Sequence, residues 1–153
     1  MKSALIDLGG NVLVVGRKPD RSLWRVGLQN PDSDRGNYIG IVALADHTMV
    51  TSGTYERYFM EGDVRYHHIL DTGTGYPVRN GLTSVTVVAT KSFDADGVTT
   101  MLFALGKEKG LELAKRLGIE VIMLDDRKRI YLTPGLSKAF RLTDSSYILS
   151  ESM

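Results

Sequence analysis

Short apolar runs separated by clusters of Gly, Pro, Asn, Asp and Ser make up the first half of the chain. Runs of this length between turn-forming residues are typical of β-strands. The predicted strands are residues 4–8, 12–16, 24–28, 38–44, 49–52, 55–60 and 64–70. The last two flank Glu61-Gly62-Asp63, a sequence that favours a hairpin turn. A loop rich in Gly, Thr and Pro follows at residues 71–81.

The hydrophobic period changes in the second half, where two helices are predicted. In residues 94–105, apolar side chains recur at i, i+3, i+4 and i+7, as on one face of a helix. The side chains expected to face inward are Val98, Met101, Leu102 and Leu105. The second helix covers residues 107–117 and ends at a glycine. Its inward side chains are expected to be Leu111, Leu113, Ala114 and Leu117.

Further strands are predicted before and after these helices, at residues 84–90, 120–124 and 129–132. A last short segment begins at Pro134, and residues 150–153 are expected to fray. The pattern predicts the α+β class, with a mostly antiparallel sheet and two helices packed on one side. With 153 residues, the chain fits a single domain that can bury a core.

Composition narrows the classes of function. The chain has no Cys, which excludes thiol catalysis, disulfides and cysteine-ligated metal sites. A net charge of +1 gives no electrostatic reason to expect nucleic acid or an anionic membrane as partner. No run approaches the roughly 18 apolar residues of a membrane span. Asp7 and two glycines interrupt the first apolar run, so we expect no signal peptide, and the compartment stays open.

The strongest local signal for chemistry is the pair Asp96 and Thr100. Their i, i+4 spacing puts both side chains on one face of the helix predicted at residues 94–105, in its first turns. A carboxylate and a hydroxyl are oxygen ligands, which suit magnesium better than a softer metal. The alternative is that Asp94 or Asp96 is an ordinary N-cap, because Asp is common at helix starts.

The second signal is the pair of adjacent histidines, His67 and His68. On a strand they point to opposite faces, so one faces the core or a cleft and the other faces outward. Histidine is the natural general base near neutral pH. The Gly/Thr-rich loop that follows could approach a phosphate or nucleobase through its backbone N–H groups. The alternative is a plain hairpin-to-loop transition with one half-buried histidine.

Two weaker signals are turns. Asp7-Leu8-Gly9-Gly10-Asn11 carries glycines that let a ligand approach the backbone. Residues 51–57 form a hydroxyl-rich turn entering a strand, and Ser52 lacks the Gly-x-Ser-x-Gly context of a hydrolase nucleophile. Side-chain hydroxyl bonds within a turn explain the second segment equally well.

Four segments, in this order, resemble one family, the FAD:protein FMN transferases, also called ApbE or thiamine-biosynthesis lipoproteins. They are residues 6–11 (IDLGGN), 51–57 (TSGTYER), 67–77 (HHILDTGTGYP) and 95–106 (ADGVTTMLFALG). The resemblance runs from about residue 4 to about residue 142. It implies an ApbE-like, T-fold-like half, made of residues 1–153 as one C-terminal domain without the family's N-terminal half.

The resemblance implies magnesium-dependent chemistry on FAD. Members of the family split FAD at its pyrophosphate and attach FMN to a threonine or serine of an acceptor flavoprotein, and some mainly hydrolyse FAD. By position, Asp96 and Thr100 match the metal-binding pair, and His68 matches the proposed base. The flavin nucleotide would lie against two segments. Their residues are Asp7, Gly9, Gly10 and Asn11 in one, and Thr74, Gly75 and Tyr76 in the other.

The chain also departs from the family pattern. Thr54, Thr72 and Gly97 stand where the family often has Asp, Pro and Ala. The family's N-terminal half, with its Gly/Ala-Lys-Gly segment, is not among these residues. We therefore expect either an enzyme completed by a separate N-terminal half or by a homo-oligomer, or a non-catalytic module that binds flavin nucleotide or oligomerises. A domain with no ligand is the third reading.

Overall fold

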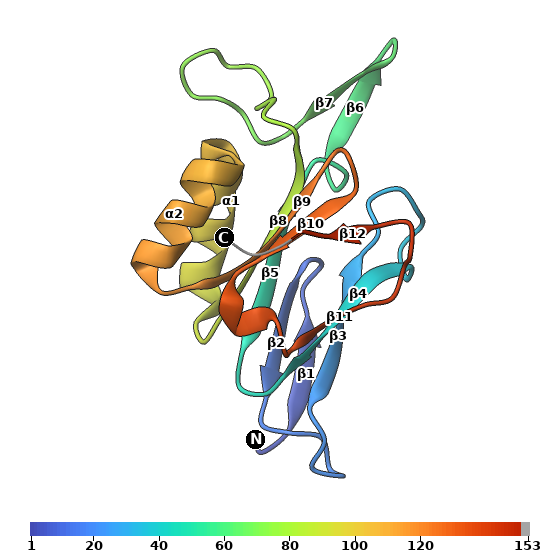
Figure 1. The fold of residues 1–153 in the computed structure, drawn as a ribbon, viewed down its shortest axis with the longest axis vertical. Coiled ribbons are helices and arrows are strands. Elements are labelled where there is room, and N and C mark those ends of the chain that lie inside the picture. Colours follow the sequence, from blue (N-terminus) through green and yellow to red (C-terminus); the bar gives the residue numbers. More distant parts are fainter. Residues whose placement is uncertain (151–153) are drawn as a thin grey trace.

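A seven-stranded sheet lies at the centre of the molecule, with helices packed on one face and a second sheet on the other (Figure 1). Each face has its own hydrophobic core. The computed structural model describes residues 1–150. The α+β class with a mostly antiparallel sheet and two helices on one side is confirmed. Within residues 1–150, no helix is both long enough and apolar enough to cross a membrane.

The large sheet has its strands in the order β1, β2, β5, β8, β9, β10 and β12. Their bounds are Ala4–Asp7, Asn11–Val15, Thr48–Gly53, Leu82–Ala89, Glu120–Asp125, Arg129–Leu132 and Ile148–Leu149. Neighbours are antiparallel except β10 and β12, which are parallel. The order places β5 between β2 and β8, so segments far apart in sequence lie side by side.

Two smaller sheets complete the strand structure. The three-stranded sheet has the order β11 (Phe140–Leu142), β4 (Tyr38–Leu44) and β3 (Trp24–Gln29). It packs on the large sheet next to the 3-10 turn at Pro134–Leu136. The two-stranded ribbon of β6 (Tyr58–Glu61) and β7 (Val64–His67) projects at the top of Figure 1, with the turn at Gly62 and Asp63 as predicted.

Side-chain alternation along the central strands builds the two cores. Val85 of β8 and Val121 and Met123 of β9 pack toward the helices. Val88 of β8 and Ile122 of β9 pack toward the three-stranded sheet. Because adjacent strand residues point to opposite faces, a strand buried on both faces is continuously apolar. The sequence pattern did not predict the second sheet, since the runs at 24–28 and 38–44 do not reveal their strand partners.

The two helices lie where the sequence predicts them, but their inward faces differ. Helix α1 (Ser92–Leu105) buries Ala95, Thr99, Leu102 and Phe103, and helix α2 (Lys107–Leu117) buries Gly110 and Ala114. The expectation that Met101, Leu105 and Leu117 face inward is wrong, because these side chains are 42%, 41% and 49% exposed. Helix α1 carries apolar residues around most of its circumference, so its sequence does not define one face.

Some predicted boundaries also shift. Helix α1 begins at Ser92 rather than residue 94, and β6 begins at Tyr58 rather than residue 55. The expected fraying of residues 150–153 falls on residues 151–153, which lie outside the described residues. Ser150 itself donates a backbone hydrogen bond to the Ile130 carbonyl at 2.8 Å.

Candidate functional site

Residues from five separate segments line one polar hollow of about 540 Å³, named here the Asp96 hollow. The segments are the β1–β2 turn, the loop between β3 and β4, the end of β5 with the turn after it, the residue that follows β7, and helix α1. The lining residues from these segments that matter below are Gly9, Gly10, Asn11, Ser52, Glu56, His68 and Asp96. The order β1-β2-β5 and the packing of α1 on β5 and β8 bring them together.

The β1–β2 turn forms one wall of the hollow. Gly9 and Gly10 have φ values of 75° and 95°, a region that favours glycine. Asp7 does not line the hollow, and its Oδ1 accepts the Gly9 N–H at 2.9 Å, which shapes the turn. The Gly10 carbonyl accepts the Thr51 N–H at 2.9 Å and ties the turn to β5.

Asn11 joins this wall to helix α1. Its Oδ1 accepts hydrogen bonds from Ser92 Oγ at 2.8 Å and from Thr48 Oγ1 at 3.2 Å. Ser92 is the first residue of α1, and Thr48 is the first residue of β5. One side-chain oxygen therefore holds β2, β5 and the start of the helix in register, a role that sequence spacing does not show.

Helix α1 presents Asp96 to the hollow. Asp96 is exposed, and within residues 1–150 its carboxylate takes part in no ion pair. Neither Asp94 nor Asp96 is the N-cap, which is Lys91. The helix starts two residues earlier than predicted, so Asp96 lies in its second turn, after the free N–H groups at the start of the helix.

Thr100 lies one turn after Asp96 and is also exposed. Its Oγ1 is 3.2 Å from Ser52 Oγ, and either hydroxyl can be the donor. Ser52 lines the hollow, whereas Thr100 is adjacent to it through this contact. Three oxygen-bearing side chains thus cluster between β5 and α1. No group of three or more His, Asp or Glu side chains with metal-site geometry occurs within residues 1–150.

The two adjacent histidines separate as predicted, one inward and one outward. His67 is buried at 7% exposure and packs edge-on against Phe103, with ring centroids 5.9 Å apart. Its Nε2 lies 3.1 Å from the Val78 carbonyl, and its Nδ1 accepts the Ile69 N–H at 3.3 Å. Burial lowers the pKa of His67, so this ring is a neutral structural group.

His68 is exposed and lines the Asp96 hollow. Its Nδ1 lies 3.1 Å from the Arg57 carbonyl. A carbonyl oxygen only accepts, so Nδ1 carries the proton in the neutral ring, and Nε2 is left as the acceptor. That tautomer can take a proton at Nε2.

The Thr74-Gly75-Tyr76 segment lies elsewhere. It is exposed in the long loop beside the β6–β7 ribbon, and it is not among the residues that line the Asp96 hollow. Asp71 organises this loop, because its Oδ1 accepts the N–H groups of Gly73 and Thr74 at 2.8 and 2.9 Å. The Thr74 and Gly73 N–H groups lower the pKa of the Asp71 carboxyl.

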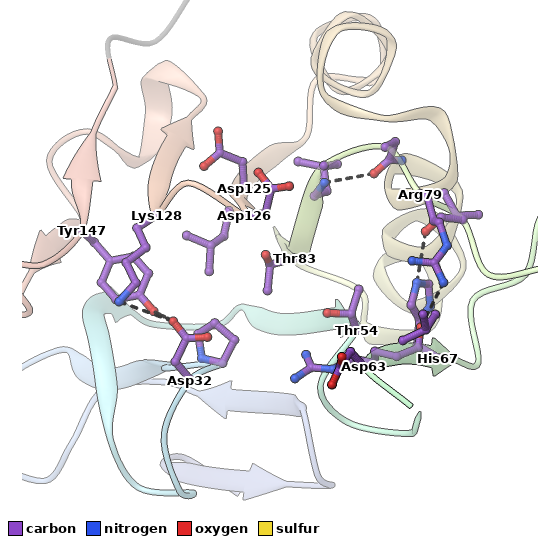
Figure 2. A pocket seen from close by; sticks show the side chains of 18 residues that line it. Asp32, Thr54, Asp63, His67, Arg79, Thr83, Asp125, Asp126, Lys128 and Tyr147 are labelled. Atoms are coloured by element: carbon purple, nitrogen blue, oxygen red, sulfur yellow. Dashed lines mark hydrogen bonds and ion pairs between the residues drawn. The ribbon is translucent and has the colours of Figure 1, made fainter. Parts of the chain in front are cut away.

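A second hollow, of about 470 Å³, lies on the His67 side of β7 (Figure 2). One ion pair and several hydrogen bonds engage part of its polar lining. Lys128 Nζ lies 3.6 Å from Asp32 Oδ2, and the Tyr147 hydroxyl donates to Asp32 and Asn30. Arg79 reaches the Arg65 carbonyl at 3.4 Å. We place the candidate site in the Asp96 hollow, where the carboxylate of Asp96 and Nε2 of His68 are not used by such pairs.

Sequence reasoning did not assign four lining residues of the Asp96 hollow to the site. Ser52, Glu56 and Arg57 belong to the 51–57 segment, which a turn with internal side-chain hydroxyl bonds explains equally well and which gave no residue with an assigned role. Arg35 comes from the loop between β3 and β4, which carries no chemical motif in the sequence. Only the position of that loop beside the hollow shows that Arg35 belongs to the site.

Comparison with known proteins identifies the family. The sequence profile of the ApbE family matches residues 1–123. A FAD:protein FMN transferase from Klebsiella pneumoniae is 43% identical over 148 residues, 96% of this chain and 45% of that protein. A protein of the same name from Treponema pallidum is 35% identical over 158 residues, covering 97% of this chain and 44% of that protein.

Solved structures give the same result. The crystal structure of the ApbE protein from Thermotoga maritima matches with a TM-score of 0.82 and 33% identity, over 91% of this chain and 45% of that chain. The apo flavinyl transferase ApbE from Pseudomonas stutzeri matches with a TM-score of 0.71 and 35% identity, over 90% of this chain and 43% of that one. The chain thus spans less than half the length of these relatives. It belongs to the ApbE family, as its four sequence motifs predict.

Proposed function

We propose that this chain supplies the base and a metal-binding pair for magnesium-dependent transfer of FMN from FAD to a threonine or serine of an acceptor flavoprotein. The observation that carries the proposal is the convergence of His68, Asp96 and the Gly9-Gly10 turn on one hollow. The names of the relatives, FAD:protein FMN transferase, support the choice of substrate.

In the reaction, one phosphorus–oxygen bond forms and another breaks. The acceptor hydroxyl oxygen attacks the FMN-side phosphorus of FAD, the phosphorus–oxygen bond to the AMP-side phosphate breaks, and AMP leaves with the bridging oxygen. The product is a phosphoester between FMN and the acceptor side chain. If water takes the place of the hydroxyl, the same bond change yields FMN and AMP.

His68 takes the proton of the attacking hydroxyl in this proposal. The Arg57 carbonyl fixes the proton on Nδ1, so Nε2 is free to accept. A positioned histidine base contributes roughly 10²–10⁴-fold in rate. Removing the base therefore slows the transfer without abolishing nucleotide binding.

The donor set fits magnesium. Asp96 and Thr100 provide a carboxylate and a hydroxyl, and Ser52 Oγ lies 3.2 Å from Thr100 Oγ1. Magnesium prefers oxygen ligands and keeps several waters when a phosphate substrate is present, so two or three protein oxygens suffice. When bound, the ion would neutralise charge that develops on the diphosphate.

The flavin nucleotide would use the glycine turn and the loop of Thr74, Gly75 and Tyr76. The turn lines the Asp96 hollow directly. The loop lies outside that hollow, and Tyr76 is 67% exposed, so its ring is available to a part of the nucleotide that extends beyond the hollow. Asp7 acts by shaping the turn, and Asn11 acts mainly by tying β2 to β5 and to the start of helix α1.

The relatives are more than twice as long as this chain, so a second piece of protein can contribute to the activity. We propose that residues 1–153 form one ApbE-like domain that a separate N-terminal half, or a second copy of this chain, completes. Strand β1 lies at the edge of the large sheet with Leu5 and Ile6 41% and 40% exposed. An open apolar edge of this kind recruits another chain.

Transfer is tested by mass spectrometry. The chain is mixed with FAD, magnesium and an acceptor flavoprotein, with and without a candidate N-terminal half, and the acceptor is examined for a covalent FMN adduct. The proposal expects the adduct in at least one combination and its loss in His68→Ala. The absence of flavinylation with every candidate N-terminal partner would contradict the proposed transfer.

A second candidate is a module that binds flavin nucleotide, or oligomerises, without turnover. It needs only the hollow and its glycine turn, without proton transfer at His68. Flavin fluorescence titration separates the two functions. Binding that depends on Asp96, together with no adduct and no FMN release, supports the binding module.

A further inference from the structure

The loop between β3 and β4 is built to hold the backbone on both sides of Arg35. The Gln29 amide makes the main contacts. Its Nε2 donates to the carbonyls of Asn30, Ser33 and Asp34 at 2.9, 3.4 and 3.2 Å. Its Oε1 accepts the Gly36 N–H at 3.2 Å. The Asn30 N–H donates to the Asn37 carbonyl at 2.8 Å, which closes the loop at its base.

Arg35 leaves this loop and reaches across to the turn that follows β5. Its Nη2 lies 2.7 Å from Glu56 Oε2, and both residues line the Asp96 hollow. The Arg35 side chain is 76% exposed, whereas that of Glu56 is 27% exposed. An exposed ion pair of this kind adds little to stability, between about 0 and 1 kcal/mol. Stability therefore does not account for a loop whose backbone is fixed on both sides of this residue.

The contact with Glu56 uses one nitrogen of the guanidinium. Within residues 1–150, Nε and Nη1 of Arg35 have no hydrogen-bond partner. A guanidinium presents five N–H donors in a planar fork that matches phosphate oxygens. Glu56 thus orients the group while leaving donors free at the rim of the hollow that also contains Asp96.

We propose that Arg35 is a specificity-determining residue that binds the diphosphate of the nucleotide in the hollow that Asp96 also lines. The inference rests on the proposed function, in which Asp96 holds the magnesium ion. A diphosphate diester carries two negative charges, and one side of it faces the metal. The oxygens on the other side need a donor, and charge-assisted hydrogen bonds to a fork-shaped cation meet that need.

The role distinguishes FAD from flavins without a diphosphate. Riboflavin lacks phosphate, so Arg35 has nothing to bind in it. Loss of the guanidinium should therefore weaken FAD binding and leave riboflavin binding unchanged. Lysine keeps the charge without the planar fork, so Arg35→Lys should have an intermediate effect.

The test is a flavin fluorescence titration of the chain in magnesium buffer, with FAD and riboflavin as probes. We expect Arg35→Ala to raise the Kd for FAD roughly tenfold to a hundredfold, the usual cost of losing a hydrogen bond to a charged group. The matched control is Arg141→Ala, an exposed arginine on β11 away from the hollow. Thermal unfolding of each variant checks that the fold is retained.

The outcomes separate this inference from the proposed function. An Arg35→Ala variant that binds FAD within twofold of the Arg141→Ala control overturns the inference. So does an equal loss of FAD and riboflavin, which indicates a merely structural role. Arg35-dependent FAD binding without any FMN transfer or release contradicts the proposed function alone. Absence of FAD binding by the parent chain, both alone and with each candidate N-terminal half, overturns both.

Discussion

The hydroxyl of Ser52 on β5 lies 3.2 Å from the hydroxyl of Thr100 on α1, across 48 residues of sequence. This contact joins a strand to a helix at the point where Asp96 enters the hollow. We expect Thr100→Val, which removes the hydroxyl at similar volume, to weaken magnesium-dependent FAD binding roughly tenfold. Thr100→Ser keeps the hydroxyl and should retain most of the binding. Equal titration curves for Thr100→Val and Thr100→Ser would show that the Thr100 hydroxyl does not contribute to binding.

Asp96 and Asp94 form a matched pair on the same helix. Both are exposed, but only Asp96 lines the hollow. Asp96→Asn should weaken magnesium-dependent FAD binding at least roughly tenfold, because the carboxylate is the strongest oxygen donor available to the ion. Asp94→Asn should change the same titration less than about twofold. Similar effects of both substitutions would show that net charge, not ligation, is responsible.

Asn11 is expected to matter for stability as much as for binding. Asn11→Ala removes the acceptor of Ser92 Oγ and leaves the buried Thr48 hydroxyl with only the Val12 carbonyl at 3.1 Å. The free energy of unfolding should fall by about 1–2 kcal/mol in chemical denaturation. Asn11→Asp keeps an acceptor oxygen and should lose less. An unchanged denaturation midpoint in Asn11→Ala would contradict the linking role.

His67 should make stability depend on pH. Its folded-state pKa lies below the unfolded value because burial disfavours the charged ring. Below about pH 6.5 the unfolded chain therefore binds more protons. The contribution of His67 is fully present above that pH and is lost as pH falls toward the folded pKa. The free energy of unfolding, measured between pH 5 and 8, should show this fall in the parent protein.

The control for this effect is the neighbouring histidine. His67→Gln should lose the part of the pH dependence that develops as pH falls below about 6.5, in addition to losing stability at pH 8. His68→Gln should keep most of the pH dependence of the parent, because it leaves the buried His67 ring in place. The assignment is wrong if His68→Gln, rather than His67→Gln, flattens the pH profile.

The observed face of α1 is tested by two adjacent residues. Leu102 is fully buried at 0% exposure, whereas Met101 is 42% exposed. Leu102→Ala should lower the free energy of unfolding by about 2–5 kcal/mol, through lost burial and a cavity. Met101→Ala should lower it by less than about 1 kcal/mol. Equal losses of unfolding free energy would indicate that Met101 also faces the core, as the sequence period predicts.

Local features of the site could be predicted from sequence. The i, i+4 spacing placed Asp96 and Thr100 on one side of α1, and strand geometry separated His67 from His68. The glycines of the β1–β2 turn and the hairpin at Gly62 were also predictable, since positive φ values favour glycine. The face of α1 was not, because apolar residues surround the helix and only packing on β5 and β8 selects one side.

By itself, the sequence determined the α+β class, the positions of the helices and most strands, and the family, because these follow from periods and motifs of neighbouring residues. Tertiary structure alone decided that Asn11, Ser52, His68 and Asp96 share a hollow, and that Arg35 and Glu56 meet beside it. The physical reason is that strand order and loop docking depend on contacts between residues far apart in the chain. Those contacts compete over the whole core, and no local pattern encodes which of them wins.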